Sequence, residues 1–131
     1  MSVVVAAAIL DGTPPRLLAA QRAYPAALAG RWELPGGKVG EGEDEIEALV
    51  RECREELGVE VVVLDRVGAD TPTVGGAGTL RVWWARLRDG EPQPLEHAAL
   101  RWLGRDELDA VAWLDADEPV VAAIRAGWPP T

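Results

Sequence analysis

Short apolar runs separated by turn residues predict a chain that mixes strands with helices. Residues 3–10 are uninterrupted apolar residues, which is typical of a strand buried on both faces, and Asp11-Gly12 ends the run as a turn. Further runs rich in Val, Leu and Trp predict strands at Arg16–Gln21, 32–34, 60–67, 79–87 and 100–103.

The apolar spacing changes to a helical period in residues 44–57. Ile46, Val50, Cys53 and Leu57 recur at steps of four, three and four, which places them on one face of a helix. Gly58 follows as the residue that ends the helix. Shorter helical patterns predict a helical turn at 105–111 and a final helix at 117–126.

These elements do not alternate strictly between strand and helix, and no repeat or linker divides the chain. Pro35-Gly36-Gly37 is expected to break the regular backbone, and residues 70–78 read as a Gly-, Pro- and Thr-containing loop. The pattern predicts one domain over residues 1–131, with an α/β (α+β) fold in which a mixed β-sheet packs between helices.

Composition narrows the class of protein. The chain has 131 residues, 48% of them hydrophobic, which suits a globular domain with a core. A formal net charge of −9 argues against a nucleic-acid polymer as a partner, because such binders usually carry a basic patch. Cys53 is the only cysteine, so no internal disulfide can form. The opening apolar run is too short for a membrane span and lacks the basic start of a secretory signal, so we expect a cytoplasmic protein without membrane contact.

Three carboxylates crowd one face of the predicted helix at 44–57. Glu52, Glu55 and Glu56 stand at i, i+3 and i+4, roughly opposite the apolar face, and like charges at this spacing repel one another. A bound cation would relieve that repulsion. Mg²⁺ takes carboxylate oxygens, water and substrate phosphates as ligands, and a Gly36 carbonyl can approach an ion closely. The pattern therefore indicates phosphate chemistry with Mg²⁺, or Mn²⁺ in its place.

The same region resembles the Nudix box, Gly-x5-Glu-x7-Arg-Glu-(apolar)-x-Glu-Glu-x-Gly-(apolar). Residues 37–59 match every fixed position, with Cys53 as a small apolar residue in an apolar slot. The stretch 31–38, the turn 89–92 followed by Glu96, and residues 116–119 are similar to the MutT-type branch and its cytidine-nucleotide relatives. The resemblance implies an α/β/α sandwich, and it implies that Gly36, Glu52, Glu55, Glu56 and Glu96 bind the metal.

Several charged residues near the box have more than one interpretation. Arg51 is expected to orient Glu52 for catalysis, and the alternative is a surface pair with Glu55 or Glu47. Glu43 is expected to support the loop or the outer metal environment. The resemblance makes Glu96 a metal ligand or general base, although its position alone fits a solvated charge. We therefore take Arg51, Glu52, Glu55 and Glu96 as the candidate catalytic residues.

His97 beside Glu96 is expected to be an exposed loop histidine, and we assign it no role. Arg22 follows a strand where MutT-like enzymes contact the nucleotide. Lys38 either touches a phosphate or is solvated. Trp32 either stacks on a base or packs in its strand.

Glu33, Leu34 and Pro35 are expected to line the cleft, with backbone groups that contact the base. Asp117 stands where the resemblance places a base-reading side chain. An ionised carboxylate only accepts hydrogen bonds, which suits the amino group of cytosine. The alternative interpretation of Asp117 is a cap of the final helix, and the two roles are compatible.

These residues predict an Mg²⁺-dependent nucleoside triphosphate pyrophosphohydrolase. Its expected substrates are dCTP, CTP or a 5-methylated form, with 8-oxo-dGTP next, and the product is a monophosphate plus pyrophosphate. One alternative is a binding domain or sensor for a nucleotide or ADP-ribose that performs no catalysis. Another is a hydrolase of a different nucleoside diphosphate derivative. We expect a small-molecule nucleotide as the partner and a monomer or homodimer as the assembly.

Overall fold

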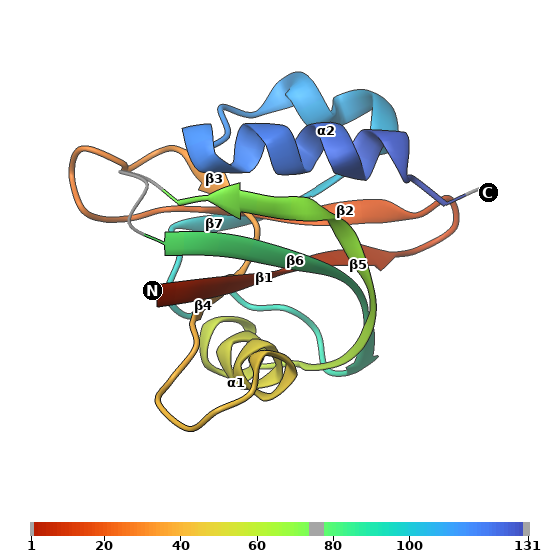
Figure 1. Ribbon diagram of the computed structural model, residues 1–131. Coiled ribbons are helices and arrows are strands. Elements are labelled where there is room, and N and C mark those ends of the chain that lie inside the picture. Colours follow the sequence, from red (N-terminus) through yellow and green to blue (C-terminus); the bar gives the residue numbers. More distant parts are fainter. Residues whose placement is uncertain (1, 74–77, 130–131) are drawn as a thin grey trace.

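The computed structural model describes residues 2–73 and 78–129, whose elements form three layers (Figure 1). A mixed sheet lies in the middle, with one helix below it and another above it in this view. The strands are β1 (Ser2–Asp11), β2 (Arg16–Gln21), β3 (Trp32–Glu33), β4 (Gly36–Lys38), β5 (Glu60–Pro72), β6 (Gly78–Asp89) and β7 (Ala99–Leu103). The helices are α1 (Glu45–Leu57) and α2 (Glu118–Ala126), with the 3-10 helices η2 (Arg105–Ala110) and η3 (Asp115–Asp117) before α2.

Strand β1 is the centre of the sheet. It pairs in parallel with β6 and antiparallel with β4 and β2, while β5 lies outside β6 and both β3 and β7 pair with β2. Residues 5–9 of β1 are all buried, as expected for a continuous apolar run in a central strand. The mixed sheet between helices confirms the fold class predicted from the sequence.

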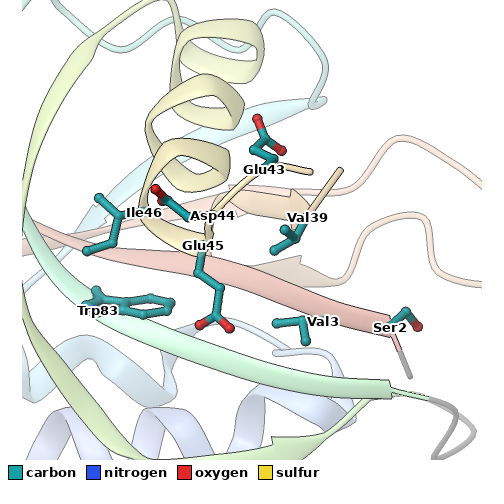
Figure 2. Close-up of a pocket in the computed structure, with 8 residues that line it drawn as sticks. All are labelled: Ser2, Val3, Val39, Glu43, Asp44, Glu45, Ile46 and Trp83. Atoms are coloured by element: carbon teal, nitrogen blue, oxygen red, sulfur yellow. The ribbon is translucent and has the colours of Figure 1, made fainter. Parts of the chain in front are cut away.

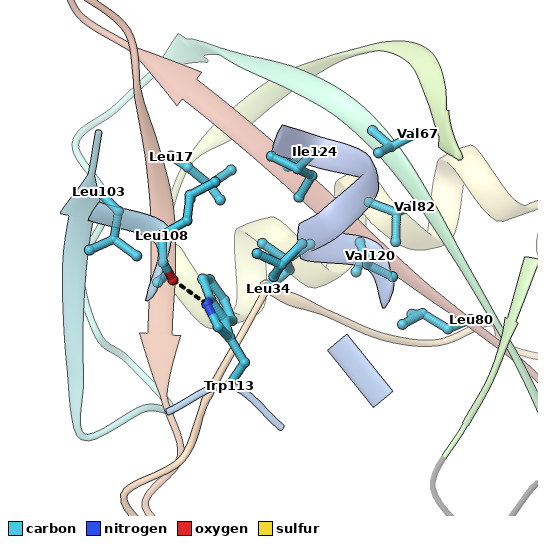
Figure 3. Close-up of a cluster of buried hydrophobic side chains, with 14 residues drawn as sticks. Leu17, Leu34, Val67, Leu80, Val82, Leu103, Leu108, Trp113, Val120 and Ile124 are labelled. Carbon is cyan, nitrogen blue, oxygen red and sulfur yellow. Dashed lines mark hydrogen bonds between the residues drawn. The ribbon is translucent and has the colours of Figure 1, made fainter. Parts of the chain in front are cut away.

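The side chains of β1 alternate between two hydrophobic clusters, one on each face of the sheet. Val5, Ala7 and Ile9 pack toward α1, whereas Ala6 and Ala8 pack toward α2. Figure 3 shows the α2 cluster, where the Trp113 Nε1–H donates to the Leu108 carbonyl oxygen at 2.7 Å. This alternation explains how one strand of small apolar residues holds both helical layers in place.

Helix α1 begins and ends at the expected residues, but the predicted apolar face is partly wrong. Asp44 caps its start in a reciprocal pair with Glu47, and Gly58 ends it with a φ of 70°. Ile46 is 47% exposed. Figure 2 shows why: it lies in the first turn of α1 and lines an open groove of about 690 Å³ beside Trp83.

The buried face of α1 is instead centred on Leu49. It consists of Ala48, Leu49, Cys53 and Leu57, and it includes Glu56. The prediction that Glu56 lies opposite the apolar face is therefore wrong. Counted from Leu49, Cys53 is at +4 and Glu56 at +7, so all three point toward the sheet.

The predicted break at residues 35–37 is wrong as well, because the two glycines form strand β4. Gly36 pairs with Ala6 and Gly37 with Val5. A Cβ at position 36 would lie 2.0 Å from the Val5 carbonyl oxygen. Glycine is needed here because the two backbones approach too closely for any side chain.

The remaining boundaries differ by a few residues. Strand β5 continues to Pro72, which shortens the start of the expected loop at 70–78, and residues 74–77 lie outside the described residues. Helix α2 begins at Glu118, after η3. Across residues 2–73 and 78–129, no helix has the length and apolar content needed to cross a bilayer.

Candidate active site

The last turns of α1 carry the three carboxylates of the predicted cluster, and two of them, Glu52 and Glu56, lie beside β4. The side chains of Glu52 and Glu56 are 15% and 7% exposed, whereas that of Glu55 is 50% exposed. The Gly36 N–H donates to Glu56 Oε1 at 3.4 Å. A Cβ at Gly37 would lie 2.4 Å from the carboxyl carbon of Glu52. The glycines of β4 therefore make room for two acidic side chains beside the strand.

Arg51 holds the outer carboxylates in place. Its guanidinium forms a two-bond fork on Glu43, at 2.7 and 2.9 Å, and also donates to Glu52 at 2.9 Å and to Glu55 at 3.2 Å. A further bond reaches the Lys38 carbonyl oxygen at 3.2 Å. The expected contact with Glu52 and the alternative pair with Glu55 are both present.

Glu43 supports the loop in front of α1, as its position suggested. Its carboxylate accepts the Gly40 N–H at 2.9 Å in addition to the Arg51 fork. The hydrogen bonds from Arg51 and Gly40 lower the pKa of Glu43 to about 2. This residue is thus a fixed negative charge that keeps Arg51 aimed at the box.

Glu56 has the opposite electrostatic environment. Burial is the largest cause that raises its pKa, followed by the negative charges of Glu33 and Glu52, and the resulting pKa is about 9. Burial also raises the pKa of Glu52, although Arg51 opposes that shift. Without a cation, Glu56 is therefore protonated at neutral pH.

A small cavity of about 100 Å³ opens beside Glu56. The loop between β6 and β7 brings Glu96 to it, and the Glu96 charge acts on both Glu52 and Glu56. The cavity joins the acidic residues to the residues that follow β2, and it is lined by Arg22, Ala23, Tyr24, Glu33, Gly36, Glu56, Glu96 and His97.

The donors around this cavity fit a hard divalent cation. They are carboxylate oxygens and a glycine backbone, and a positive charge would offset both the burial of Glu56 and its repulsion by Glu52 and Glu96. Within the residues that the structure describes, no three acidic, Cys or His side chains already lie in a metal-binding geometry. The carboxylates would therefore have to converge when a cation binds.

Arg22 and Glu33, expected to contact the nucleotide, bind each other. The Arg22 guanidinium donates to the two Glu33 oxygens at 3.1 and 3.3 Å, and its Nε–H donates to the Tyr24 carbonyl at 3.1 Å. The Lys38 side chain is exposed and does not line the cavity. Trp32 is partly buried and packs against the α2 cluster, as in the alternative interpretation of this residue.

Asp117 lies next to Leu34, the residue that follows β3. Its side chain is buried, and Oδ2 accepts the Leu34 N–H at 3.0 Å. Asp117 occupies the N-cap position of α2, as the alternative interpretation predicted, but its side chain makes no capping hydrogen bond to that helix. Desolvation raises its pKa to about 7, against the effect of the Leu34 hydrogen bond. The Leu34 and Pro35 side chains are themselves buried, which leaves backbone groups as their means of contact.

His97 differs most from its expected place. Its side chain is 6% exposed, and Nε2 lies 2.9 Å from Glu33 Oε2 and 3.7 Å from Glu56 Oε1. No pattern in the sequence signalled this burial, because the contacts cross 64 and 41 positions of the chain. The histidine therefore joins the box helix to the residues expected to contact the nucleotide.

Comparison with known proteins agrees with this geometry. The NUDIX domain family profile matches residues 1–124. A Mycobacterium tuberculosis protein named "Putative 8-oxo-dGTP diphosphatase 2" is 50% identical over 93% of this chain and 86% of its own length. The Escherichia coli CTP pyrophosphohydrolase is 38% identical over 93% of this chain and 90% of its own.

A solved structure gives the same result for the fold. The solution structure of the E. coli ORF135 protein aligns with a TM-score of 0.79 and 37% identity, covering 100% of this chain and 95% of that one. The family match, the curated relatives and the shared fold all coincide with the box on α1. The chain therefore belongs to the Nudix family, as a MutT-type hydrolase of nucleotide pyrophosphate bonds.

Proposed function

We propose that this hydrolase is an Mg²⁺-dependent nucleoside triphosphate pyrophosphohydrolase that prefers a cytosine nucleotide, with 8-oxo-dGTP as the second substrate. The relatives support both bases, since one is named for CTP and another for 8-oxo-dGTP. Water attacks the β-phosphorus, the bond from that phosphorus to the α–β bridging oxygen breaks, and pyrophosphate and a monophosphate leave. Such an activity would remove unwanted nucleotides from the cellular pool.

The residues that would hold Mg²⁺ are Gly36, through its carbonyl, and the four carboxylates Glu52, Glu55, Glu56 and Glu96. The ion would neutralise phosphate charge and lower the pKa of a bound water. Arg51 keeps Glu52 and Glu55 oriented, because its guanidinium is itself held by Glu43. The proton of the attacking water passes to a carboxylate among Glu52, Glu55 and Glu96.

The observation that carries the choice of base is the environment of Asp117. Oδ2 is occupied by the Leu34 N–H, and within the described residues no group donates to Oδ1. An ionised Oδ1 accepts a hydrogen bond, which matches the amino group of cytosine. Guanine-type bases present O6 at the corresponding edge and need Asp117 to donate a proton, so burial, which raises the pKa of Asp117 to about 7, favours them below that pH and leaves cytosine favoured above it.

The test is a kinetic comparison of dCTP, 5-methyl-dCTP, 8-oxo-dGTP and dGTP with Mg²⁺. Asp117→Asn should lower the preference for dCTP over 8-oxo-dGTP by about tenfold, because one unpaired donor or acceptor is worth roughly 1–3 kcal/mol. Asp115→Asn is the matched control, since that side chain is 95% exposed on the same 3-10 helix. An unchanged preference in Asp117→Asn would contradict the assignment of Asp117.

The class of reaction is tested separately. Glu56→Gln should lose at least about a hundredfold in turnover if Glu56 binds the cation. Pyrophosphate release from a triphosphate, measured beside cleavage of ADP-ribose, distinguishes the proposal from a hydrolase of other nucleoside diphosphate derivatives. Equal turnover by Glu56→Gln and the wild type would rule out the proposed metal site.

A further inference from the structure

His97 occupies an unusual position in the loop that carries Glu96. Residues 91–96 are mainly exposed, yet the His97 side chain is 6% exposed. It points between Glu33 of β3 and Glu56 of α1, at 2.9 and 3.7 Å from their nearest oxygens. A buried polar side chain in an otherwise solvated loop indicates that the loop is fastened at this point.

Backbone hydrogen bonds fasten the loop on either side of Glu96 and His97. The Leu95 N–H donates to the Glu56 carbonyl at 3.1 Å, and the Ala98 N–H donates to the Gln21 carbonyl at 2.8 Å. Glu96 lies between these two anchors. In residues 91–98, all of them described, the bond from His97 to Glu33 is the one hydrogen bond made by a side chain.

The partner of His97 is itself held firmly. Glu33 also accepts two hydrogen bonds from Arg22, so its carboxylate has little freedom to follow the loop. Because a carboxylate accepts, His97 Nε2 must carry the proton. Nδ1 is buried without a partner, and a bare lone pair is tolerated there better than a buried N–H would be. The geometry therefore selects the Nε2–H tautomer and gives the ring one direction.

We infer that His97 is a positioning residue that sets Glu96 beside the carboxylates of α1 by bonding to Glu33. It thereby links the cation end of the site to the end where Arg22 lies. This inference rests on the proposed function only in that Glu96 is taken as a cation ligand. The inference assigns His97 a role through Glu33 and Glu96, and none that requires contact with substrate or ion.

Three substitutions separate the hydrogen bond from simple packing. In His97→Gln the side-chain amide nitrogen reaches about as far as Nε2, so it can still donate to Glu33. In His97→Asn the amide is too short to reach, and His97→Ala removes the donor altogether. We expect Asn and Ala to raise the Mg²⁺ concentration for half-maximal activity by about tenfold and to lower kcat more than KM, with Gln within about threefold of wild type.

Two measurements do not depend on turnover. Mn²⁺ binding to the protein without nucleotide, followed by calorimetry, should weaken by about tenfold in the Ala and Asn variants and stay near wild type in Gln. His97 is the only histidine, so its ¹⁵N-edited spectrum needs no assignment and should show a slowly exchanging proton on Nε2. That proton should exchange faster in Glu33→Gln.

The outcomes distinguish this inference from the proposed function. A wild type that hydrolyses no triphosphate refutes the proposed function, while Mn²⁺ binding and the histidine spectrum still decide the role of His97. Equal Mn²⁺ affinity in all variants, or equal losses in Gln, Asn and Ala, would overturn the inference. A proton found on Nδ1 in the wild type would overturn it even if the variants did not fold.

Discussion

Replacing Glu56 by Gln should stabilise the protein in the absence of metal. Glu56 is buried beside Glu33 and Glu52, and its pKa is raised to about 9 from an ordinary value of 4.5. Gln keeps a carbonyl that can accept the Gly36 N–H, but it has no proton to gain or lose. The substitution therefore removes the electrostatic penalty while it keeps the shape of the side chain.

The size of the effect follows from the two pKa values. Between pH 4.5 and pH 9 the folded protein binds the Glu56 proton and the unfolded chain does not, so stability falls as the pH rises. The slope is about 1.4 kcal/mol per pH unit, which gives a penalty of at most about 4 kcal/mol at pH 7.5. Water that enters the site reduces this value, so we expect Glu56→Gln to gain about 2 to 4 kcal/mol there.

Urea unfolding in EDTA between pH 6 and pH 8.5 measures the effect. The free energy of unfolding of Glu56→Gln minus that of wild type should grow by about 2 kcal/mol from pH 7 to pH 8.5, because the subtraction cancels groups such as Asp117. Glu55→Gln, half exposed on the same helix, is the control and should show no such growth. A cation favours ionised Glu56, so Mg²⁺ should stabilise wild type increasingly with pH and Glu56→Gln little.

The reasoning fails if Glu56→Gln is less stable than wild type at pH 8 in EDTA. It also fails if both proteins lose stability in parallel as the pH rises. Either result would mean that water solvates Glu56 despite its 7% exposed side chain. The penalty that a metal ion is proposed to relieve would then be absent.

Three further substitutions test separate parts of the molecule. Gly37→Ala places a Cβ 2.4 Å from the Glu52 carboxyl carbon, so kcat/KM should fall by about 10- to 100-fold while the melting temperature changes little. Arg51→Lys loses the planar fork and should lower kcat by about tenfold, whereas a wild-type rate would show that the fork is dispensable. Trp113→Phe removes the hydrogen bond from the indole N–H to the Leu108 carbonyl and should cost about 1–3 kcal/mol in urea unfolding, with kcat/KM unchanged.

The sequence was most informative where one local pattern determines the structure. Strand β1 is a continuous apolar run with no competing helical period, and it is buried along residues 5–9. Helix α1 carries its own cap, its own ending glycine and the box. Such features need no knowledge of distant residues, and they were placed to within one residue.

Strand β4 was missed because glycines carry no side chain from which to infer a strand. In the sequence Gly36 and Gly37 look like a turn, but glycine is required there because residues of other elements pack against both positions. A Cβ at Gly36 would clash with the Val5 carbonyl, and a Cβ at Gly37 would clash with the Glu52 side chain. Both neighbours belong to other elements, so a local interpretation could not find them.

The burial of Glu56 and Asp117 was not predicted, for a similar reason. The helical face predicted for α1 included Ile46, which turned the expected buried arc away from Glu56. A face centred on Leu49 would have included Glu56 and raised the question of a buried charge. The hydrogen-bond partner of Asp117, Leu34, lies 83 positions away, so the burial of Asp117 had no local signal.

The distribution of charge explains why the cluster points to a cation. Arg51 offsets the carboxylates of Glu43, Glu52 and Glu55, and Arg22 offsets that of Glu33. Glu56 and Glu96 have no Arg or Lys partner in the described parts of the chain, and the charge of Glu96 raises the pKa of Glu52 and Glu56. A third basic residue beside Glu56 would make the metal-free protein more stable, but it would occupy the position that a divalent ion needs. The acidic groups without a basic partner therefore lie beside the cavity, where burial makes ionisation of Glu56 costly and a bound cation would offset that cost.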